Sequence, residues 1–383
     1  MLGPRLRFVE RTKVLFEGRR YTFFGGNDYH RLSSHPEVVR AAAEAAAAEG
    51  LGSAGSRVTT GNHPLYEALE RAIARFAGSE AALTVASGYL ANLALLEAAG
   101  KSFGRFFVDE SAHSSVLEAC LRLPRDRVHR FRHLDPDDLA RLVRSELRAG
   151  ERPLVLTDGV FPSRGEIAPL DAYAAAVRGL GGALVVDDAH AIGVIGRTGK
   201  GTWEERGLGR GDRLESGGGL LQTGTLSKAL GAFGGFVAAG AETAARVVEE
   251  SLVFSGATGI PLPLAAAAVR SIEILEREPE RIARLRERTL SWKGRIAALG
   301  YPVEPTPVPI VSIVPIEERA REALRSSLFR RGVYPPYISY PGAPAGGHFR
   351  FTFSSGHTEE EFEALAAALG DAPPGASAAG RAR

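Results

Sequence analysis

In residues 183–190, Ala-Leu-Val-Val-Asp-Asp-Ala-His, a short apolar run ends in two acids and a histidine. A run of this length and composition is typical of a strand that is buried on both faces of a parallel sheet. Its carboxyl end would carry Asp187, Asp188 and His190 to the edge where open α/β sheets bind their ligands. Buried ionisable side chains usually have a role, so the segment predicts a ligand site. A metal pair or plain strand capping would use the same residue types, and the segment alone leaves both open.

Similar apolar runs recur through the first two thirds of the chain and alternate with helical patterns. We expect strands over 81–86, 105–109, 127–132, 153–158, 183–187, 220–225 and 235–239, and helices over 65–76, 89–98, 114–123, 136–147 and 170–180. This alternation predicts an α/β fold whose mostly parallel, seven-stranded sheet is covered by helices on both faces.

The pattern changes towards the carboxyl end and predicts a second, smaller α+β domain. Its expected elements are a helical stretch over 261–299, a strand over 308–315, a helix over 318–331, a Pro/Gly-rich loop over 335–347, a strand over 349–353 and a helix over 359–369. We therefore divide the chain into an N-terminal segment with a short hairpin (1–35), a large domain (36–270), a small domain (271–372) and a loose tail (373–383).

Composition excludes several classes of partner. The 47 basic and 45 acidic residues nearly balance, so bulk charge predicts neither nucleic acid nor a membrane surface as a partner. The single cysteine, Cys120, excludes an internal disulfide, and no apolar run is long enough to span a bilayer. These features lead us to expect a cytoplasmic protein.

A lysine among small and hydroxylated residues is the second chemical signal. Lys228 follows an apolar strand pattern in the sequence Thr225-Leu-Ser-Lys228. Desolvation at such a place lowers the pKa of an amine and favours its nucleophilic form, as a Schiff-base lysine requires. A solvated lysine at a strand end would look the same, so the motif alone does not decide between the two.

Further segments stand in order along the chain and are far more specific together than any one alone. They are Gly52-Ser-Ala-Gly-Ser-Arg57, Ser87-Gly-Tyr-Leu-Ala-Asn92, Asp109-Glu-Ser-Ala-His-Ser-Ser115, Thr157-Asp-Gly-Val-Phe161, Asp187-Asp-Ala-His190, Thr225-Leu-Ser-Lys228 and Arg350-Phe-Thr-Phe-Ser-Ser-Gly-His-Thr358. In this order they resemble the α-oxoamine synthases, enzymes of fold type I that depend on pyridoxal phosphate. The resemblance runs from about Asn27 to the last expected helix.

The resemblance implies a role for each matching residue. Lys228 would bond to the cofactor and act as the base, Asp187 would contact the pyridine nitrogen, His113 would stack on the ring, and His190 would contact its phenolate oxygen. The other implied assignments are the backbone N–H groups of Gly88 and Tyr89 and the hydroxyl of Thr225 for the cofactor phosphate, Ser255 or Thr258 for the phosphate of the neighbouring subunit, and Arg350, Asn27 and Ser56 for the substrate.

Three positions depart from the family pattern. Pro162-Ser-Arg-Gly165 replaces a segment that supplies a serine near the ring oxygen, Tyr66 stands where the family has histidine, and His30-Arg31 replaces Leu-Gly. Residues 214–219 also look like an insertion with a flexible glycine run. These departures are compatible with the cofactor chemistry of the family but leave the identity of the substrate open.

The resemblance implies a decarboxylating condensation of a small amino acid with an acyl-CoA, in a homodimer with a shared active site. Ser56 occupies a position where the glycine-specific members of the family carry threonine, so the smaller side chain favours alanine. Three alternatives stay open: condensation of glycine with acetyl-CoA, a fold-type-I aminotransferase and a non-catalytic partner subunit. Lys228 argues against the last.

Overall fold

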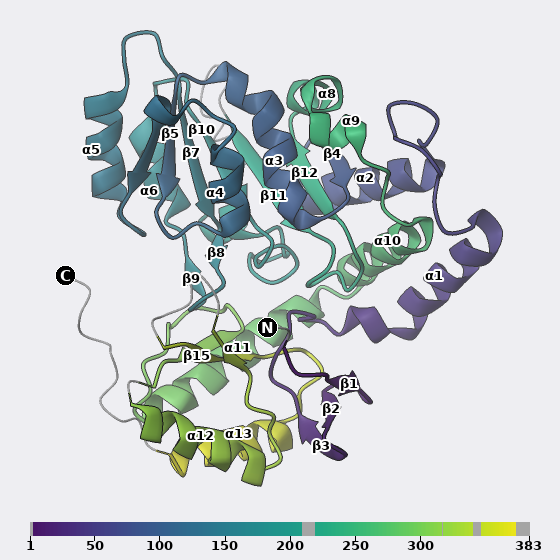
Figure 1. Cartoon of the computed structure of the whole chain (residues 1–383), viewed down its shortest axis with the longest axis vertical. Helices are drawn as coiled ribbons and strands as arrows, with labels where there is room; N and C mark the ends of the chain where they lie inside the picture. The colour runs from purple at the N-terminus through teal and green to yellow at the C-terminus, as the bar shows by residue number, and fades with distance from the viewer. Residues whose placement is uncertain (1–2, 209–218, 316, 340–345, 373–383) are drawn as a thin grey trace. The chain divides into compact units, whose positions relative to one another are not determined.

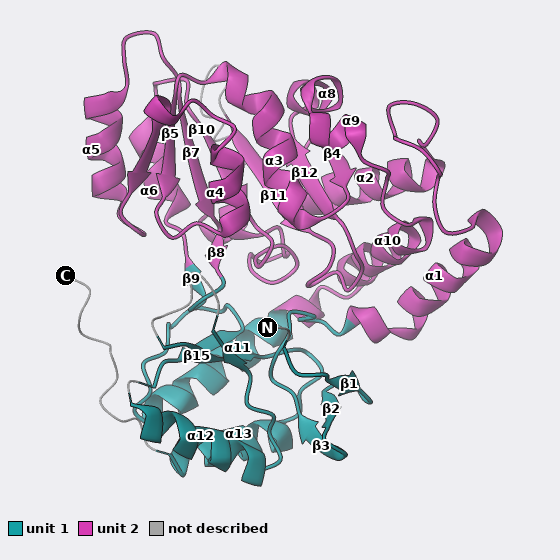
Figure 2. Cartoon of the chain, viewed as in Figure 1, with its two compact units in different colours: residues 1–31, 162–166, 283–383 teal, residues 32–161, 167–282 magenta. Residues whose placement is uncertain are grey.

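The computed structural model describes residues 3–208, 219–315, 317–339 and 346–372. The chain forms two compact units, one of residues 32–161 and 167–282 and the other of residues 1–31, 162–166 and 283–383 (Figure 2). The division expected from the sequence differs, because it cut the chain at 270 and treated 1–35 as a separate segment. The expected tail (373–383) and most of the expected insertion (214–219) lie outside the described residues.

The larger unit is built on a seven-stranded sheet. In sheet order its strands are β4 (Ala81–Val85), β12 (Gly235–Ala239), β11 (Leu220–Thr225), β10 (Ala183–Asp187), β7 (Pro153–Asp158), β5 (Arg105–Asp109) and β6 (Val128–Phe131). Strand β12 is antiparallel to both of its neighbours, and the other pairings are parallel. All seven predicted strands and the mostly parallel sheet are confirmed.

Helices pack on both faces of this sheet, as Figure 1 shows within the larger unit. They are α1 (Pro36–Glu49), α2 (Pro64–Ala77), α3 (Gly88–Ala99), α4 (Ser114–Cys120), α5 (Pro136–Glu146), α6 (Leu170–Val177), α7 (Thr202–Glu205), α8 (Ala241–Glu250), α9 (Leu252–Gly256) and α10 (Leu262–Arg277). Successive residues of β10 enter different apolar clusters, Val185 with Leu95 and Val116, and Val186 with Leu139 and Tyr173. Burial on both faces explains why β10 reads as an uninterrupted apolar run.

The expected helical stretch over 261–299 is in fact two helices. Helix α10 ends at Arg277, and α11 (Glu280–Ala298) begins after Pro279. Proline cannot donate a backbone hydrogen bond and restricts the residue before it, which explains the break. Helix α1 was not expected, because its alanine-rich sequence gives little apolar periodicity, and only Val38 is buried in it.

The smaller unit holds two three-stranded antiparallel sheets. One is β1 (Arg7–Phe8), β2 (Lys13–Phe16) and β3 (Arg19–Thr22), so the expected hairpin carries a third strand. The other has the order β13 (Ile310–Ile313), β15 (His348–Thr352) and β14 (Tyr337–Ile338). Helices α12 (Glu318–Arg330) and α13 (Glu359–Gly370) belong to the same unit. Its core is strongly aromatic, with Trp292 stacked on Phe362 at 4.5 Å between ring centroids.

Two short strands, β8 (Val160–Phe161) and β9 (Glu166–Ile167), flank residues 162–165 along the chain and pair with each other. Among the described residues, no helix combines the length and apolar character that crossing a bilayer requires.

Candidate functional site

The carboxyl edge of the large sheet carries the groups that the sequence singled out. Asp158 and Asp187 are paired residues at the ends of β7 and β10, His113 follows β5, and Lys228 follows β11. Burial is the main cause of the pKa shifts of His113, which is lowered, and Asp158, which is raised, and the charge of Lys228 also acts on both groups. These side chains, spread over 116 positions of sequence, therefore lie within electrostatic reach of one another.

The two adjacent acids at the end of β10 have separate surroundings. Asp188 is fully buried, and its carboxylate accepts hydrogen bonds from the backbone N–H and hydroxyl of Thr202 and from the amide of Gln222. Burial raises the pKa of Asp188 to about 6, against the opposing effect of these donors. Asp187 instead accepts from the backbone N–H of Ala189 and from Asn92. Asp188 thus holds the segment at Thr202 in place, and Asp187 is the acid available to a ligand.

The metal alternative has no support in this arrangement. The carboxylates of Asp187 and Asp188 bind different donors, and the described part of the chain contains no group of three or more His, Cys, Asp or Glu side chains that could hold a metal ion.

His113 caps the amino end of α4 and is held from two sides. Its Nδ1 lies 2.8 Å from the hydroxyl of Ser115, and its backbone N–H donates to the Asp158 carboxylate at 3.0 Å. Burial, assisted by the charge of Lys228, lowers the pKa of His113, so the ring is neutral at pH 7. A neutral, fixed imidazole is suited to face contact with an aromatic ligand.

Asp158 is buried, and its carboxylate accepts a hydrogen bond from the backbone N–H of His113 rather than from a basic side chain. Burial and the neighbouring Asp187 raise the pKa of Asp158 well above its ordinary value. Asp158 therefore differs from Asp187 in its surroundings, because its carboxylate accepts from the backbone N–H of His113 and Asp187 accepts from Asn92 and Ala189.

Lys228 lies in a bend immediately after β11, and its half-buried side chain lies between the desolvated and the solvated alternatives that the sequence left open. Thr225, at the end of the same strand, holds this bend because its Oγ1 donates to the Gly234 carbonyl at 3.0 Å and accepts from the Ser227 backbone N–H. The amine is therefore placed by a structured turn while it stays accessible to a ligand.

The amino end of α3 approaches this turn closely. A Cβ on Gly88 would lie 2.7 Å from Cβ of Thr225, so only glycine fits at the first helical position. Free backbone N–H groups at a helix start form a ready anion site. Gly88 and Tyr89 are therefore arranged as a phosphate site requires, whereas the single hydroxyl proton of Thr225 is donated to the Gly234 carbonyl.

We expect Gly88→Ala to weaken binding of a phosphorylated cofactor by about tenfold or more, because the added methyl group pushes the helix start from the Thr225 turn. Titration of the purified variant with the cofactor, followed by absorbance, measures the effect. Gly294→Ala is the matched control, since nothing lies within 4 Å of the added Cβ. Equal cofactor affinity in the two variants would contradict the assignment of the helix start.

In the smaller unit, Arg350 on β15 is buried, and its guanidinium donates hydrogen bonds to neutral oxygens rather than to a carboxylate. Its Nε donates to the Pro162 carbonyl at 2.7 Å, and both of its terminal nitrogens donate to Asn27 Oδ1 at 3.2 Å. Tyr29 also contacts Arg350, and burial raises the pKa of Tyr29 to about 12, so this partner is neutral too. A guanidinium held by neutral oxygens keeps its charge for an anionic ligand.

Two positions that the sequence related to the substrate, Ser56 and Tyr66, lie in the larger unit. The Ser56 hydroxyl donates to the Ser255 carbonyl at 2.5 Å, and Ser56 forms an isolated antiparallel bridge with the exposed Thr258. Tyr66 is fully buried, and its hydroxyl donates to the Ile260 carbonyl at 2.7 Å. In this unit Tyr66 therefore ties α2 to the segment before α10.

His190 lies in the turn after β10 and is buried. Its contact with a ring oxygen stays a prediction, as do the roles of the other site residues.

Three polar residues near Asp187 received no role from the sequence. Asn92, Ser115 and Thr223 are buried and form side-chain hydrogen bonds with one another that end on Asp187 and His113. Asn92 and Ser115 stood inside the quoted motifs, and an asparagine on a mostly apolar helix was the available signal.

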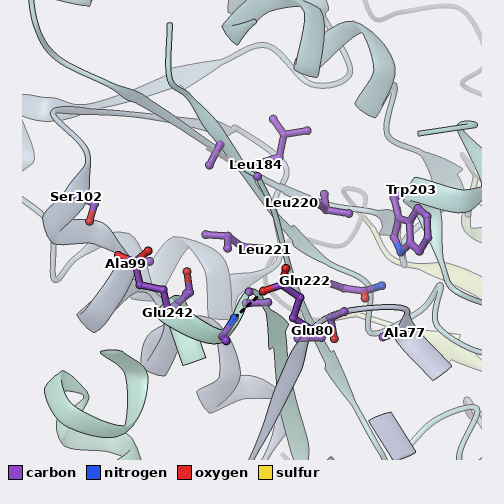
Figure 3. Close-up of a pocket in the computed structure, with 18 of the residues that line it drawn as sticks. Ala77, Glu80, Ala99, Ser102, Leu184, Trp203, Leu220, Leu221, Gln222 and Glu242 are labelled. Carbon is purple, nitrogen blue, oxygen red and sulfur yellow. Dashed lines mark hydrogen bonds between the residues drawn. The ribbon is translucent and has the colours of Figure 1, made fainter. Parts of the chain in front are cut away.

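A cavity of about 560 Å³ lies at the opposite, amino end of the parallel strands (Figure 3). Leu184 and Leu220, near the starts of β10 and β11, line it together with Trp203, Glu80 and Glu242. It is thus separate from the carboxyl edge that carries Lys228 and Asp187.

Comparison with known proteins places these features in a family. The model of the aminotransferase class I and II family matches residues 20–369. The chain is 38% identical to the 8-amino-7-oxononanoate synthase of Alkalilimnicola ehrlichii, over 92% of this chain and 88% of that one. It is 34% identical to the 8-amino-7-oxononanoate synthase of Symbiobacterium thermophilum, over 94% and 91% of the two chains.

A solved structure gives the same result for the fold. The chain matches serine palmitoyltransferase from S. paucimobilis, solved with a bound PLP–myriocin aldimine, with a TM-score of 0.85 and 26% identity. The match covers 94% of this chain and 90% of that one.

Proposed function

The chain belongs to the aminotransferase class I and II family and is a pyridoxal-phosphate-dependent α-oxoamine synthase, and from this premise we propose that it joins L-alanine to pimeloyl-CoA. This is the reaction of an 8-amino-7-oxononanoate synthase in biotin biosynthesis. The bond from the alanine Cα to the acyl carbon forms, the thioester C–S bond breaks to release CoA, and the alanine carboxylate leaves as carbon dioxide.

The observation that supports the proposal most strongly is the convergence of Lys228, Asp187 and His113 at one edge of the sheet. The residues fit the cofactor: an accessible amine, a carboxylate with one donor on each oxygen, a neutral imidazole and a helix start that admits only glycine. When bound, pyridoxal phosphate supplies an electron sink for the carbanion formed at Cα of the amino acid.

Each residue then has one task. Asp187 would accept a hydrogen bond from the cofactor's ring nitrogen and keep that nitrogen charged, and His113 would cover the ring face. Lys228 Nζ would hold the cofactor and, once the amino acid has displaced it, would be the free amine that takes the Cα proton. His190 would donate to the ring oxygen, and the start of α3 would bind the phosphate; the Thr225 hydroxyl would join it by giving up its hydrogen bond to the Gly234 carbonyl.

Arg350 binds the substrate carboxylate, with Asn27 orienting its two terminal nitrogens. The charge is available for this task because the partners of Arg350 are neutral oxygens. Holding the carboxylate in one orientation fixes which bond at Cα lies in position to break.

A matrix of amino acids and acyl-CoA thioesters, scored by release of CoA and of carbon dioxide, tests the proposal. Alanine with pimeloyl-CoA is expected to be the productive pair. Glycine with acetyl-CoA would instead identify a glycine C-acetyltransferase, and an α-keto acid product without carbon dioxide would identify an aminotransferase. Purified protein that binds no pyridoxal phosphate would identify a non-catalytic partner subunit.

We expect Ser56→Thr to lower the ratio of kcat/KM for alanine to that for glycine by about tenfold, because the added methyl group takes the room that the alanine methyl needs. Steady-state assays with both amino acids measure this ratio. Ser56→Ala is the control, since it loses the hydrogen bond to the Ser255 carbonyl but adds no bulk. If Ser56→Ala changed the ratio as much as Ser56→Thr, the hydrogen bond and not the size would be responsible.

We also propose that the enzyme works as a cytoplasmic homodimer and that Thr258 serves the cofactor phosphate of the partner subunit. The exposure of Thr258 supports this assignment. Analytical ultracentrifugation tests the dimer, and a monomeric active enzyme would contradict it.

A further inference from the structure

We propose that Asn92 and Thr223 are positioning residues that hold the Asp187 carboxylate and, through Ser115, the His113 ring in one hydrogen-bonded network. The network joins four elements of the larger unit, because Asn92 lies on α3, Ser115 on α4, Asp187 on β10 and Thr223 on β11. It rests on the cofactor site proposed above and is independent of which substrates the enzyme takes.

Asn92 is the centre of the network, and its side chain is fully buried. Its amide nitrogen donates to Asp187 Oδ2 at 2.7 Å and to Ser115 Oγ at 3.0 Å, which uses both N–H groups. Its Oδ1 accepts from the Thr223 hydroxyl at 2.6 Å. Both donors and the amide oxygen thus have partners, so the side chain has a single orientation.

The orientation of the amide follows from Asp187. An ionised carboxylate only accepts hydrogen bonds, so the Asn92 nitrogen must face Asp187 and the Asn92 oxygen must face Thr223. Thr223 is fully buried and can satisfy that oxygen only by donating its single hydroxyl proton. Removing this hydroxyl leaves a buried amide oxygen without its donor and frees the amide to turn.

Two functional groups depend on the network. The backbone N–H of Ala189 occupies Asp187 Oδ1 and Asn92 occupies Oδ2, which fixes the plane of the carboxylate that faces the ring nitrogen. Ser115 links the same amide to Nδ1 of His113 at 2.8 Å. One change at Thr223 is therefore expected to disturb both the charge partner and the ring-stacking group of the cofactor.

Thr223→Val and Thr223→Ser form a matched pair for the test. Valine keeps the shape and loses the hydroxyl, whereas serine keeps the hydroxyl and loses a methyl group. We expect Thr223→Val to weaken pyridoxal phosphate binding about tenfold and to change the visible circular dichroism of the saturated protein, while Thr223→Ser stays within about twofold of wild type. Calorimetry of both apo-proteins reports stability separately.

The opposite pattern would overturn the proposal. If Thr223→Ser lost as much affinity as Thr223→Val, packing would explain the effect, and wild-type affinity and dichroism in Thr223→Val would show that the hydroxyl positions nothing. Should Thr223→Val not fold, Asn92→Asp keeps the shape of its side chain and removes the donors, and it is expected to bind the cofactor more weakly than Thr223→Ser does. Wild-type cofactor affinity in Asn92→Asp would also overturn the proposal. None of these measurements uses an amino acid or an acyl-CoA, so a failure of the proposed substrates leaves their outcome unchanged.

Discussion

Lys228→Ala is expected to lower turnover by about 10⁴-fold, because it removes the residue that binds the cofactor and the base that takes the Cα proton. The fold should persist, since Lys228 is half-buried in a bend and contributes no apolar side chain to the core clusters. Release of CoA under saturating substrates measures the loss, and the visible absorbance of the covalently bound cofactor should disappear with it.

Lys200→Ala is the matched control. Lys200 is also half-buried in the larger unit, and its ammonium lies 6.0 Å from the centre of the Trp203 ring. We expect its removal to leave turnover near that of wild type. Equal losses in the two variants, or full turnover in Lys228→Ala, would contradict the role assigned to Lys228.

Asp187→Asn is expected to lower kcat by about 10³-fold, because a neutral amide no longer stabilises the positive charge on the cofactor's ring nitrogen. The substitution keeps the size of the side chain. One oxygen can still accept from Ala189, but the new amide nitrogen faces the Asn92 donor, so we also expect a loss of about 1–3 kcal/mol of unfolding free energy. Single-turnover kinetics at saturating cofactor separate this effect from weaker cofactor binding.

The adjacent acid gives the control, for which we expect the opposite outcome in kcat. Asp188→Asn places an amide nitrogen among the donors of Thr202 and Gln222, and the mismatch should cost about 1–3 kcal/mol of unfolding free energy. We expect kcat of this variant to stay close to that of wild type. Large losses of kcat in both variants with unchanged stability would show that the two acids do not have separate roles.

The central sheet was predictable because burial on both faces leaves a largely apolar run in strands such as β7 and β10. The run before Asp187 and that before Lys228 each end where the strand ends, so the sequence placed both side chains at the carboxyl edge. The antiparallel direction of β12 was not predictable, since an apolar run carries no information on strand direction.

Features that depend on contacts between residues far apart in the chain could not be predicted from the sequence. The Thr223 hydroxyl reaches Asn92 across 131 positions of the chain, and no local pattern relates the two. Residues 1–31 group with the carboxyl-terminal part through contacts such as the Thr22 backbone N–H to the Gly332 carbonyl. The half-buried state of Lys228 likewise depends on the bend that Thr225 and Gly234 form after the strand.

Mapping the lysine that carries the cofactor tests the account most directly. The chain has five lysines, Lys13, Lys101, Lys200, Lys228 and Lys293. Lys293 is the natural competitor, because burial lowers its pKa to about 7 and so favours its nucleophilic form. Reduction of the cofactor-loaded protein with borohydride, followed by proteolysis and mass spectrometry, should find the pyridoxyl group on Lys228. Its attachment to Lys293 or to no lysine would contradict the account.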